Sequence, residues 1–342
     1  MFVDLHHCSP RPSSSESVAD ECNDRCVLGQ WNYIYANPGQ EGSPLIEIDA
    51  DSDISKVAFA ANGEYIVCDG YDEVGVWRVD DGKEMARLAV THIRCLAASK
   101  DGGWIAAGTY EGNVFVWDAK TFKQVFSHSE DPYLISGVDF SLDATRVVTA
   151  SGNCTAPVWD VATCKKVLSL PHEATVIAAK YSPQGDRIAT ATYTGSVRFW
   201  DSNDGRLLVH IRAKVTPAYN AGLLWSNDHL FVVLKSTIRQ IEASTGSTVS
   251  EWLVPKANDY SCIAIPNHGE FVVYSTDDTV TFWDTSTHAQ LGLIKHTQPI
   301  RSIALSPDDR FLATGGEEGK ITHRSLSRIT VSIVSFWITA SQ

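Results

Sequence analysis

The sequence lacks the features that mark a secreted or membrane-spanning chain. Its first ten residues carry Asp4 and two histidines where a secretory leader would have its apolar core. The longest apolar run, Ile329 to Ala340, is short for a bilayer and is interrupted by serines. The eight cysteines form no CxxC pair, so no disulfide framework is expected. We therefore expect a cytoplasmic or nuclear protein whose thiols are reduced.

The motifs of the common enzyme classes are missing as well. The sequence has no Gly-rich phosphate loop, no HExxH and no GxSxG, and its cysteines lack the context of a nucleophile. Two clusters contain metal-ligating side chains but lack the spacing of a zinc finger or of a calcium loop. They are His6, His7, Cys8, Cys22 and Cys26, and the alternating Asp49, Asp51 and Asp53. We predict a non-enzymatic protein with no catalytic residue, no cofactor and no bound metal.

Positive charge is scarce. The formal net charge is −13, and between Glu41 and Glu84 twelve carboxylates face only Lys56, Arg78 and Lys83. Such a surface repels phosphate backbones, which argues against nucleic acid as a partner. It favours a protein partner with a basic surface through long-range steering, although a merely solvated acidic face is the simpler interpretation.

A repeat of about forty residues dominates the chain. A short apolar strand ending in Trp-Asp, or in a degenerate form of this dipeptide, recurs at intervals of 40 to 42 residues. The repeating position falls at Trp77, Trp117, Trp159, Trp200, Ile241, Trp283 and Arg324. The dipeptide is intact at Trp117-Asp118, Trp159-Asp160, Trp200-Asp201 and Trp283-Asp284. A period held this closely over seven units indicates a single repeat architecture.

Each unit has the same internal order of strands and turns. A turn such as Pro183-Gln184-Gly185 lies upstream of each Trp position, with a short apolar strand on either side of it. Four short strands per repeat describe one blade of a β-propeller, and strands without strict alternation are covered on both faces. The pattern resembles the WD40-repeat family over residues 45–326. The resemblance implies an all-β, seven-bladed propeller of four-stranded antiparallel blades.

In that family the first strand of the chain often completes the last blade. The resemblance implies that Leu45 to Ile48 pairs with the blade that carries Phe311 and Ile321. Tyr35 lies 42 residues before Trp77, so the segment Trp31 to Tyr35 is in register with the repeat. It could be an extra strand, a remnant of a lost blade or half of an eighth blade. We favour seven blades, because only Ile329 to Phe336 remains to supply further strands.

The composition divides the chain into three parts. We predict a disordered segment over residues 1–30, which are polar and contain prolines. The propeller spans residues 31–326, and an apolar tail follows over residues 327–342. The tail either pairs as an additional strand or competes with residues 45–48 for the last blade.

The resemblance also implies a hydrogen-bonded set in each blade. It comprises a His in the loop that enters the blade, a Ser or Thr on the second strand, an Asp in the next turn, and the Trp. In the fourth blade His172, Thr190 and Trp200 match, and Thr194 stands at the Asp position.

The set is incomplete in the other blades. In the sixth blade Ser275, Asp277 and Trp283 are the expected members. In the seventh blade His296 and Thr314 match, but Glu318 and Arg324 replace Asp and Trp. Trp77, Trp117 and Trp159 are also predicted to be structural.

Partner proteins usually dock in this family on the loops that enter the blades and on the turns before the Trp strand. By register, these loops carry an aromatic patch over the first five blades: Tyr71, His92, Tyr110, Leu134, Tyr193 and Tyr219. Tyrosine is enriched at interface hot spots because it offers a large contact area with one polar group. The alternative is that these tyrosines only cap the blades.

The sequence therefore favours a scaffold or adaptor that mediates protein–protein interaction. A ligand-sensing propeller of a larger signalling receptor is the alternative, motivated by the irregular repeats and the register of Tyr35. A channel-based enzyme is disfavoured by the missing motifs. Neither the partners nor the oligomeric state follow from the sequence.

Overall fold

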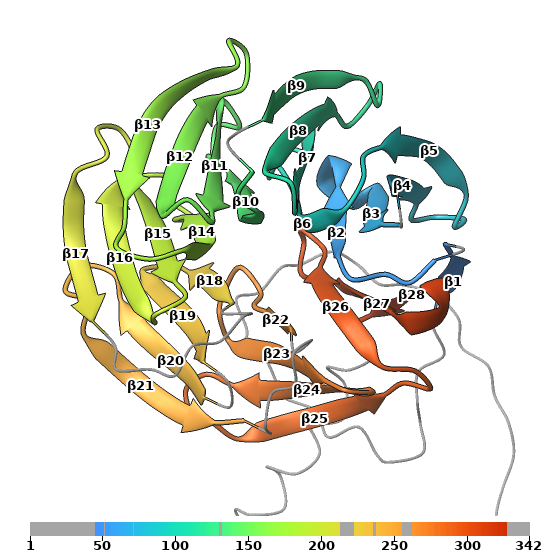
Figure 1. Ribbon diagram of the computed structural model, residues 1–342. Coiled ribbons are helices and arrows are strands. Elements are labelled where there is room, and N and C mark those ends of the chain that lie inside the picture. Colours follow the sequence, from blue (N-terminus) through green and yellow to red (C-terminus); the bar gives the residue numbers. More distant parts are fainter. Residues whose placement is uncertain are drawn as a thin grey trace, which may run out of the picture. The chain divides into compact units, whose positions relative to one another are not determined.

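A computed structural model describes residues 45–50, 52–70, 72–129, 132–212, 222–234, 237–254 and 262–326. In these residues 28 strands form seven four-stranded antiparallel sheets, which makes this part of the chain a seven-bladed β-propeller (Figure 1). The predicted fold class is confirmed. Trp31 to Tyr35, the segment 1–30 and the tail 327–342 lie outside the described residues, so the predicted domain limits stay predictions.

Each of the first six blades consists of four strands that follow one another along the chain. The first three blades are β2 (Val57–Ala60), β3 (Tyr65–Asp69), β4 (Glu73–Arg78), β5 (Glu84–Ala89); β6 (Ile93–Ala98), β7 (Trp104–Thr109), β8 (Asn113–Asp118), β9 (Gln124–Ser129); and β10 (Ile135–Phe140), β11 (Arg146–Ser151), β12 (Thr155–Asp160), β13 (Lys165–Pro171). The fourth and fifth blades are β14 (Val176–Tyr181), β15 (Arg187–Thr192), β16 (Ser196–Asp201), β17 (Leu207–Arg212); and β18 (Leu223–Ser226), β19 (His229–Leu234), β20 (Thr237–Glu242), β21 (Thr248–Leu253).

The sixth blade is β22 (Cys262–Ala264), β23 (Phe271–Thr276), β24 (Thr279–Asp284), β25 (Gln290–Lys295). The seventh is β26 (Ile300–Leu305), β27 (Phe311–Gly316), β28 (Lys320–Ser325) and β1 (Ile46–Asp49). Two short 3-10 helices, η1 (Ala61–Gly63) and η2 (Glu317–Gly319), lie in turns of the first and seventh blades.

The last blade is completed by the first strand, as the resemblance implied. β1 pairs antiparallel with β28, with Ile46 opposite His323 and Ile48 opposite Ile321. In Figure 1 the blue β1 lies beside the red β28. The two ends of the described propeller therefore share one sheet.

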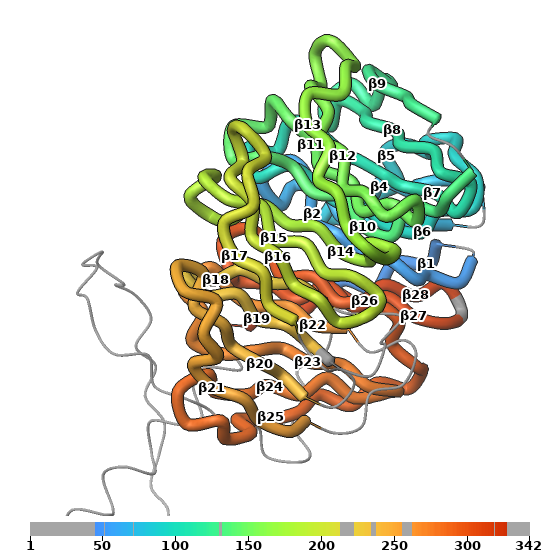
Figure 2. The backbone as a smooth tube through the Cα atoms, turned by 60° about the vertical axis from the view of Figure 1, so that its left-hand side comes forward, coloured from blue at the N-terminus to red at the C-terminus, as the bar shows by residue number. Residues whose placement is uncertain are grey.

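The hydrophobic core lies between neighbouring blades. The described residues form seven buried clusters, and each draws its side chains from two adjacent blades. The second and third strands are buried almost throughout, since both of their faces are covered. The outer strands, such as β13 and β21, lie on the periphery and are more exposed (Figures 1 and 2).

The 40-to-42-residue period has a packing cause. The Trp position always falls on the third strand of a blade, one residue before its end. From there the ring packs against the preceding blade: Trp159 joins the cluster that includes Val114 and Phe126 of the second blade. Because each such ring seals the boundary between two blades, its spacing must follow the length of one blade.

The turn after the third strand is also fixed by its neighbour. Gly246 has a φ of +74° in the turn between β20 and β21, and a Cβ there would lie 2.5 Å from Cγ1 of Val209 on β17. Glycine meets both demands, since it adopts positive φ freely and has no side chain. The turn of one blade thus rests directly on the outer strand of the blade before it.

Candidate protein-interaction surface

One face of the propeller is formed by the loops that enter the blades and by the turns between second and third strands. We call it the loop face. In four blades the backbone N–H of a turn residue donates to the carbonyl of a residue in the entering loop. The pairs are Tyr110 to His92 (3.0 Å), Gly152 to Leu134 (2.9 Å), Tyr193 to Thr175 (2.9 Å) and Glu317 to Pro299 (3.3 Å).

Tyr110 is the most exposed aromatic side chain on the loop face among the described residues, with 55% of its surface accessible. The guanidinium of Arg94, on β6, lies over its ring at 5.8 Å from the centroid. Such a contact holds the phenol in place from one side and leaves the other side open. The neighbouring His92 is exposed, and its ring hydrogen-bonds the carboxylate of Glu111.

The loop that enters the third blade adds a second exposed ring. Tyr133 is 50% accessible, and Leu134 beside it is half-buried. Leu134 was predicted from the sequence, whereas Tyr133 was not. The sequence did contain a signal for Tyr133. It directly precedes Leu134, the position selected by register, and it follows Pro132, which is typical of a loop.

These side chains belong to adjoining loops. Gly108, near the end of β7, lies so close to Ile135 that a Cβ would meet its side chain at 2.5 Å. This contact brings the turn of Tyr110 next to the loop of Tyr133. On the other side, Thr175 donates through its hydroxyl to the carbonyl of Gly152 at 3.4 Å, which links the third blade to the fourth.

Tyr193 follows in the fourth blade, where it is half-buried and in contact with neighbouring groups. The loop face therefore carries a contiguous patch over the second, third and fourth blades, which we call the tyrosine patch: His92, Arg94, Tyr110, Tyr133, Leu134 and Tyr193. Tyr71 and Tyr219 lie outside the described residues, so their place in the patch stays a prediction.

Ion pairs offset part of the acidity of the first blade. Arg87 on β5 pairs with Glu73 (2.6 Å) and with Glu84 (2.8 Å), and Arg78 pairs with Asp81. The Arg78 guanidinium and the backbone N–H of Lys83 hold the pKa of the Asp81 carboxyl down to about 2. These surface pairs contribute little to stability, but they lower the local excess of negative charge.

The structural residues of the fourth blade form a hydrogen-bonded chain. His172 contacts the carbonyl of Leu170 through Nδ1 (2.9 Å) and the hydroxyl of Thr190 through Nε2 (2.8 Å). Burial, aided by Arg198, lowers the pKa of His172 to about 4, so the ring is neutral at pH 7. Because a carbonyl only accepts, Nδ1 carries the proton, and Thr190 donates to Nε2. Trp200 Nε1 in turn donates to Thr190 at 2.8 Å.

The other blades keep parts of this chain. In the third blade Trp159 Nε1 donates to Thr149 at 3.3 Å, and the ring of His128 lies 4.1 Å from that of Trp159. Trp77 and Trp117 are buried between blades in the same way.

The expected set of the sixth blade needs a correction. Trp283 Nε1 donates to Thr281 on its own strand (2.9 Å), whereas the hydroxyl of Ser275 bonds the backbone of Cys262. Ser275 lies two residues beyond the position that corresponds to Thr190, where this blade has Val273. The nearby Asp277 adopts a φ of 49° in the turn, and its carbonyl accepts from the N–H of Ile300.

In the seventh blade the set does not assemble. Thr314 hydrogen-bonds Thr322 at 2.7 Å, and Nε2 of His296 is buried without a hydrogen-bond partner in the described part of the chain. Burial, with Arg324 nearby, lowers the pKa of His296 to about 4.

The aspartate of each Trp-Asp pair caps the turn after the third strand. Asp118 accepts from the N–H of Lys120 and Thr121, and Asp160 accepts from Thr163. Asp201 and Asp284 make the same bonds in their blades. The hydrogen bond from the backbone N–H of Thr121 contributes most to lowering the pKa of Asp118. These aspartates therefore serve the turn geometry.

In the described ranges no group of three or more His, Cys, Asp or Glu side chains could hold a metal ion. No helix in the same residues is long and apolar enough to cross a membrane.

These observations define a class: a seven-bladed β-propeller built from repeats whose tryptophans seal the boundaries between blades. The family model "WD domain, G-beta repeat" matches residues 85–118, 120–160, 163–201 and 289–323. Three of these matches end on the aspartate of a Trp-Asp pair. The chain is a WD40-repeat protein with degenerate repeats.

Curated relatives resemble the chain over long stretches at low identity. WD repeat-containing protein 18 of Danio rerio is 21% identical over 300 residues, which is 78% of this chain and 68% of the relative. The Serine-threonine kinase receptor-associated protein of Gallus gallus is 24% identical, over 54% of this chain and 53% of the relative. The Pre-rRNA-processing protein crb3/ipi3 of Schizosaccharomyces pombe is 23% identical, over 66% and 54%. The chain thus spans between about half and two thirds of these relatives.

Proposed function

We propose that this chain is a non-catalytic scaffold that binds other proteins through the tyrosine patch of its loop face. WD40 propellers generally bind other proteins, and this supports the general role. The observation that carries the specific surface is the pair of exposed rings, Tyr110 and Tyr133, on adjoining loops. A cytoplasmic or nuclear location and a preference for partners with basic groups belong to the same proposal.

The patch has the composition of a hot spot. Tyrosine and arginine dominate the binding energy of many interfaces, because they bury large areas and keep polar groups for hydrogen bonds. Arg94 already holds the ring of Tyr110, so this side chain loses little freedom on binding, and a backbone bond to Gly152 fixes the main chain at Leu134.

The test is a pull-down from native extract with quantitative mass spectrometry. It compares the wild type with a double variant, Tyr110→Ala and Tyr133→Ala. Both residues are exposed, so the variant is expected to keep the wild-type unfolding curve. The matched control is Leu142→Ala with Val167→Ala, which removes two side chains of similar exposure (47% and 42%) away from the loop face.

We expect the tyrosine variant alone to lose the partners of the wild type, by tenfold or more for each. If both variants keep the same partners, the surface has been assigned to the wrong residues. If the wild type captures no specific protein, the scaffold role itself is refuted.

A further inference from the structure

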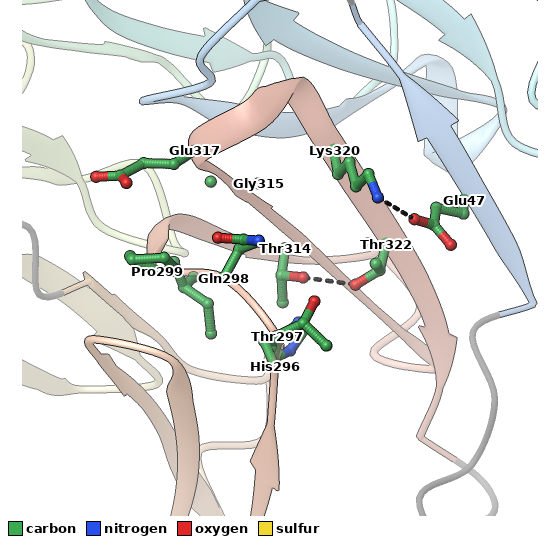
Figure 3. A pocket seen from close by; sticks show the side chains of 12 residues that line it. Glu47, His296, Thr297, Gln298, Pro299, Thr314, Gly315, Glu317, Lys320 and Thr322 are labelled. Carbon is green, nitrogen blue, oxygen red and sulfur yellow. Dashed lines mark hydrogen bonds and ion pairs between the residues drawn. The ribbon is translucent and has the colours of Figure 1, made fainter.

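A small cavity lies in the seventh blade, beside the loop between β25 and β26 that enters this blade. Its volume is about 50 Å³. The side chains that line it include Glu47, His296, Gln298, Thr314, Lys320 and Thr322, which come from β1, the entering loop, β27 and β28 (Figure 3). Thr297 and Pro299 on its rim are exposed, so the cavity is accessible from solvent.

The fourth blade shows why the cavity exists. There the corresponding space holds Arg198, which lies two residues before Trp200 and is 7% exposed. Its guanidinium lies over the Trp200 ring (5.7 Å), donates to the carbonyl of Pro171 (2.6 Å) and pairs with Glu173.

The seventh blade lacks both members of this ion pair and the ring that lies against it. By register Thr322 replaces Arg198, Thr297 replaces Glu173 and Arg324 replaces Trp200. The short Thr322 side chain leaves the space of a long cation unfilled. The replacement of Glu173 by threonine removes the carboxylate that would attract a new cation to it.

The wall of the cavity offers more hydrogen-bond donors than it uses. Nε2 of His296 is buried and has no partner among the described residues, and it is a donor when the neutral ring carries its proton there. The bond between Thr314 and Thr322 needs only one of their two hydroxyl hydrogens. The Gln298 amide adds further donors, and the Lys320 ammonium, which pairs with Glu47, still has N–H groups to donate (Figure 3).

The carboxylates of the wall are already engaged. Glu317 pairs with Arg301 at 2.6 Å, and Glu47 faces Lys320 at 3.5 Å. Around His296 the charged groups are Arg324 and Asp278, and Lys295 lies 3.5 Å from Asp278. An incoming anion therefore meets the unused donors of the threonine hydroxyls and the Gln298 amide, whereas an incoming cation meets the ammonium of Lys320.

We infer that this cavity binds the carboxylate of a glutamate or aspartate side chain from a partner peptide. The size agrees, since 50 Å³ corresponds to about four water-sized positions and a carboxylate with its methylene has four heavy atoms. The site is separate from the tyrosine patch and does not depend on it. It gives an acidic protein one local pocket for acidic side chains.

The test uses the full chain with ¹³C-labelled histidine, observed by NMR at pH 7. The probe is N-acetyl-glutamate amide, and its matched neutral control is N-acetyl-glutamine amide. The His296 signal is assigned from the variant His296→Gln. The glutamate probe is expected to shift this signal saturably, with a dissociation constant in the millimolar range. The signal of His172, whose Nε2 already has Thr190 as a partner, serves as the internal control and stays in place.

Two variants change side chains of the cavity wall and keep His296, whose NMR signal reports binding. Thr322→Arg places the side chain of the fourth blade in the cavity and should abolish the shift. Lys320→Gln removes the positive charge of the wall and should weaken binding at least threefold. A wild-type unfolding curve shows that either variant is folded.

Three results would overturn the inference. One is an equal shift with the glutamine probe, since charge would then play no part. Another is a larger shift with N-acetyl-arginine amide, which would show that the cavity accepts a guanidinium as the fourth blade does. The third is a glutamate shift that survives in Thr322→Arg, which would place the binding elsewhere.

Discussion

The hydrogen-bonded chain of the fourth blade makes a quantitative prediction about stability. Thr190→Val keeps the shape of the side chain and removes its hydroxyl, which receives Trp200 Nε1–H and donates to His172 Nε2. Thr190 is fully buried, so water cannot replace it. The variant leaves one donor and one acceptor unsatisfied.

The magnitude follows from those two atoms. Each orphaned buried group costs about 1–3 kcal/mol. The apolar valine partly offsets this cost, so we expect a loss of about 3 kcal/mol in the free energy of unfolding. Chemical denaturation should show a lower midpoint with an unchanged slope, because the surface exposed on unfolding is the same.

The third blade provides the control. Thr149→Val removes one longer bond, from Trp159 at 3.3 Å, and should cost about 1 kcal/mol. A double-mutant cycle with His172→Leu isolates the coupling between His172 and Thr190, which should be about 1 kcal/mol or more. A coupling below about 0.3 kcal/mol, or equal losses in the two blades, would refute the reasoning.

Three further outcomes are expected. Arg324→Trp places an indole ring at the repeat position of the seventh blade, beside Thr314 and His296, and should raise the unfolding free energy by about 1 kcal/mol. Arg324→Leu has no indole N–H and should not raise it. Denaturation curves of the two variants provide the comparison. Gly246→Ala should lower the unfolding free energy by about 2 kcal/mol in the same assay, because it combines a φ of +74° with a 2.5 Å clash. Gly205→Ala should lower it less, because its φ is +72° but its nearest contact is 3.2 Å. The depressed pKa values of His172 and His296, both about 4 against 6.5 in the unfolded chain, mean that the unfolded state binds more protons between these values. Stability should therefore be constant above pH 6.5 and fall as the pH drops toward 4, and His172→Gln should flatten this slope; an equal slope in the variant would contradict the assignment.

The sequence predicted the fold well because one long-range constraint repeats. The Trp position of every unit falls at the same place on a third strand, since its ring must reach the preceding blade. The pairing of β1 with β28 was also predicted, although the residues lie at opposite ends of the described chain. The first feature depends on register, which a period displays directly, whereas the second was implied by the resemblance to the WD40-repeat family.

Features that depend on side-chain contacts were harder to predict from the sequence. Ser275 resembled the fourth-blade threonine in type, but it lies two residues out of register and bonds the backbone of Cys262. Tyr133 lies one residue away from the position that register selects. The seventh-blade cavity is lined by Thr297 and Thr322, and only the structure brings these two positions together.

The closure of the ring has a consequence for the order in which the protein forms. During synthesis β1 leaves the ribosome before the other described strands, but its partner β28 is the last of them to be made. Until then β1 is an unpaired edge, and its four residues must wait for the longest loop closure in the propeller. The other six blades can assemble from local contacts as they emerge, whereas the seventh forms only after β28 has emerged. The final step of folding therefore determines whether the ring exists at all, and a delay at that step leaves open the one blade that contains the cavity.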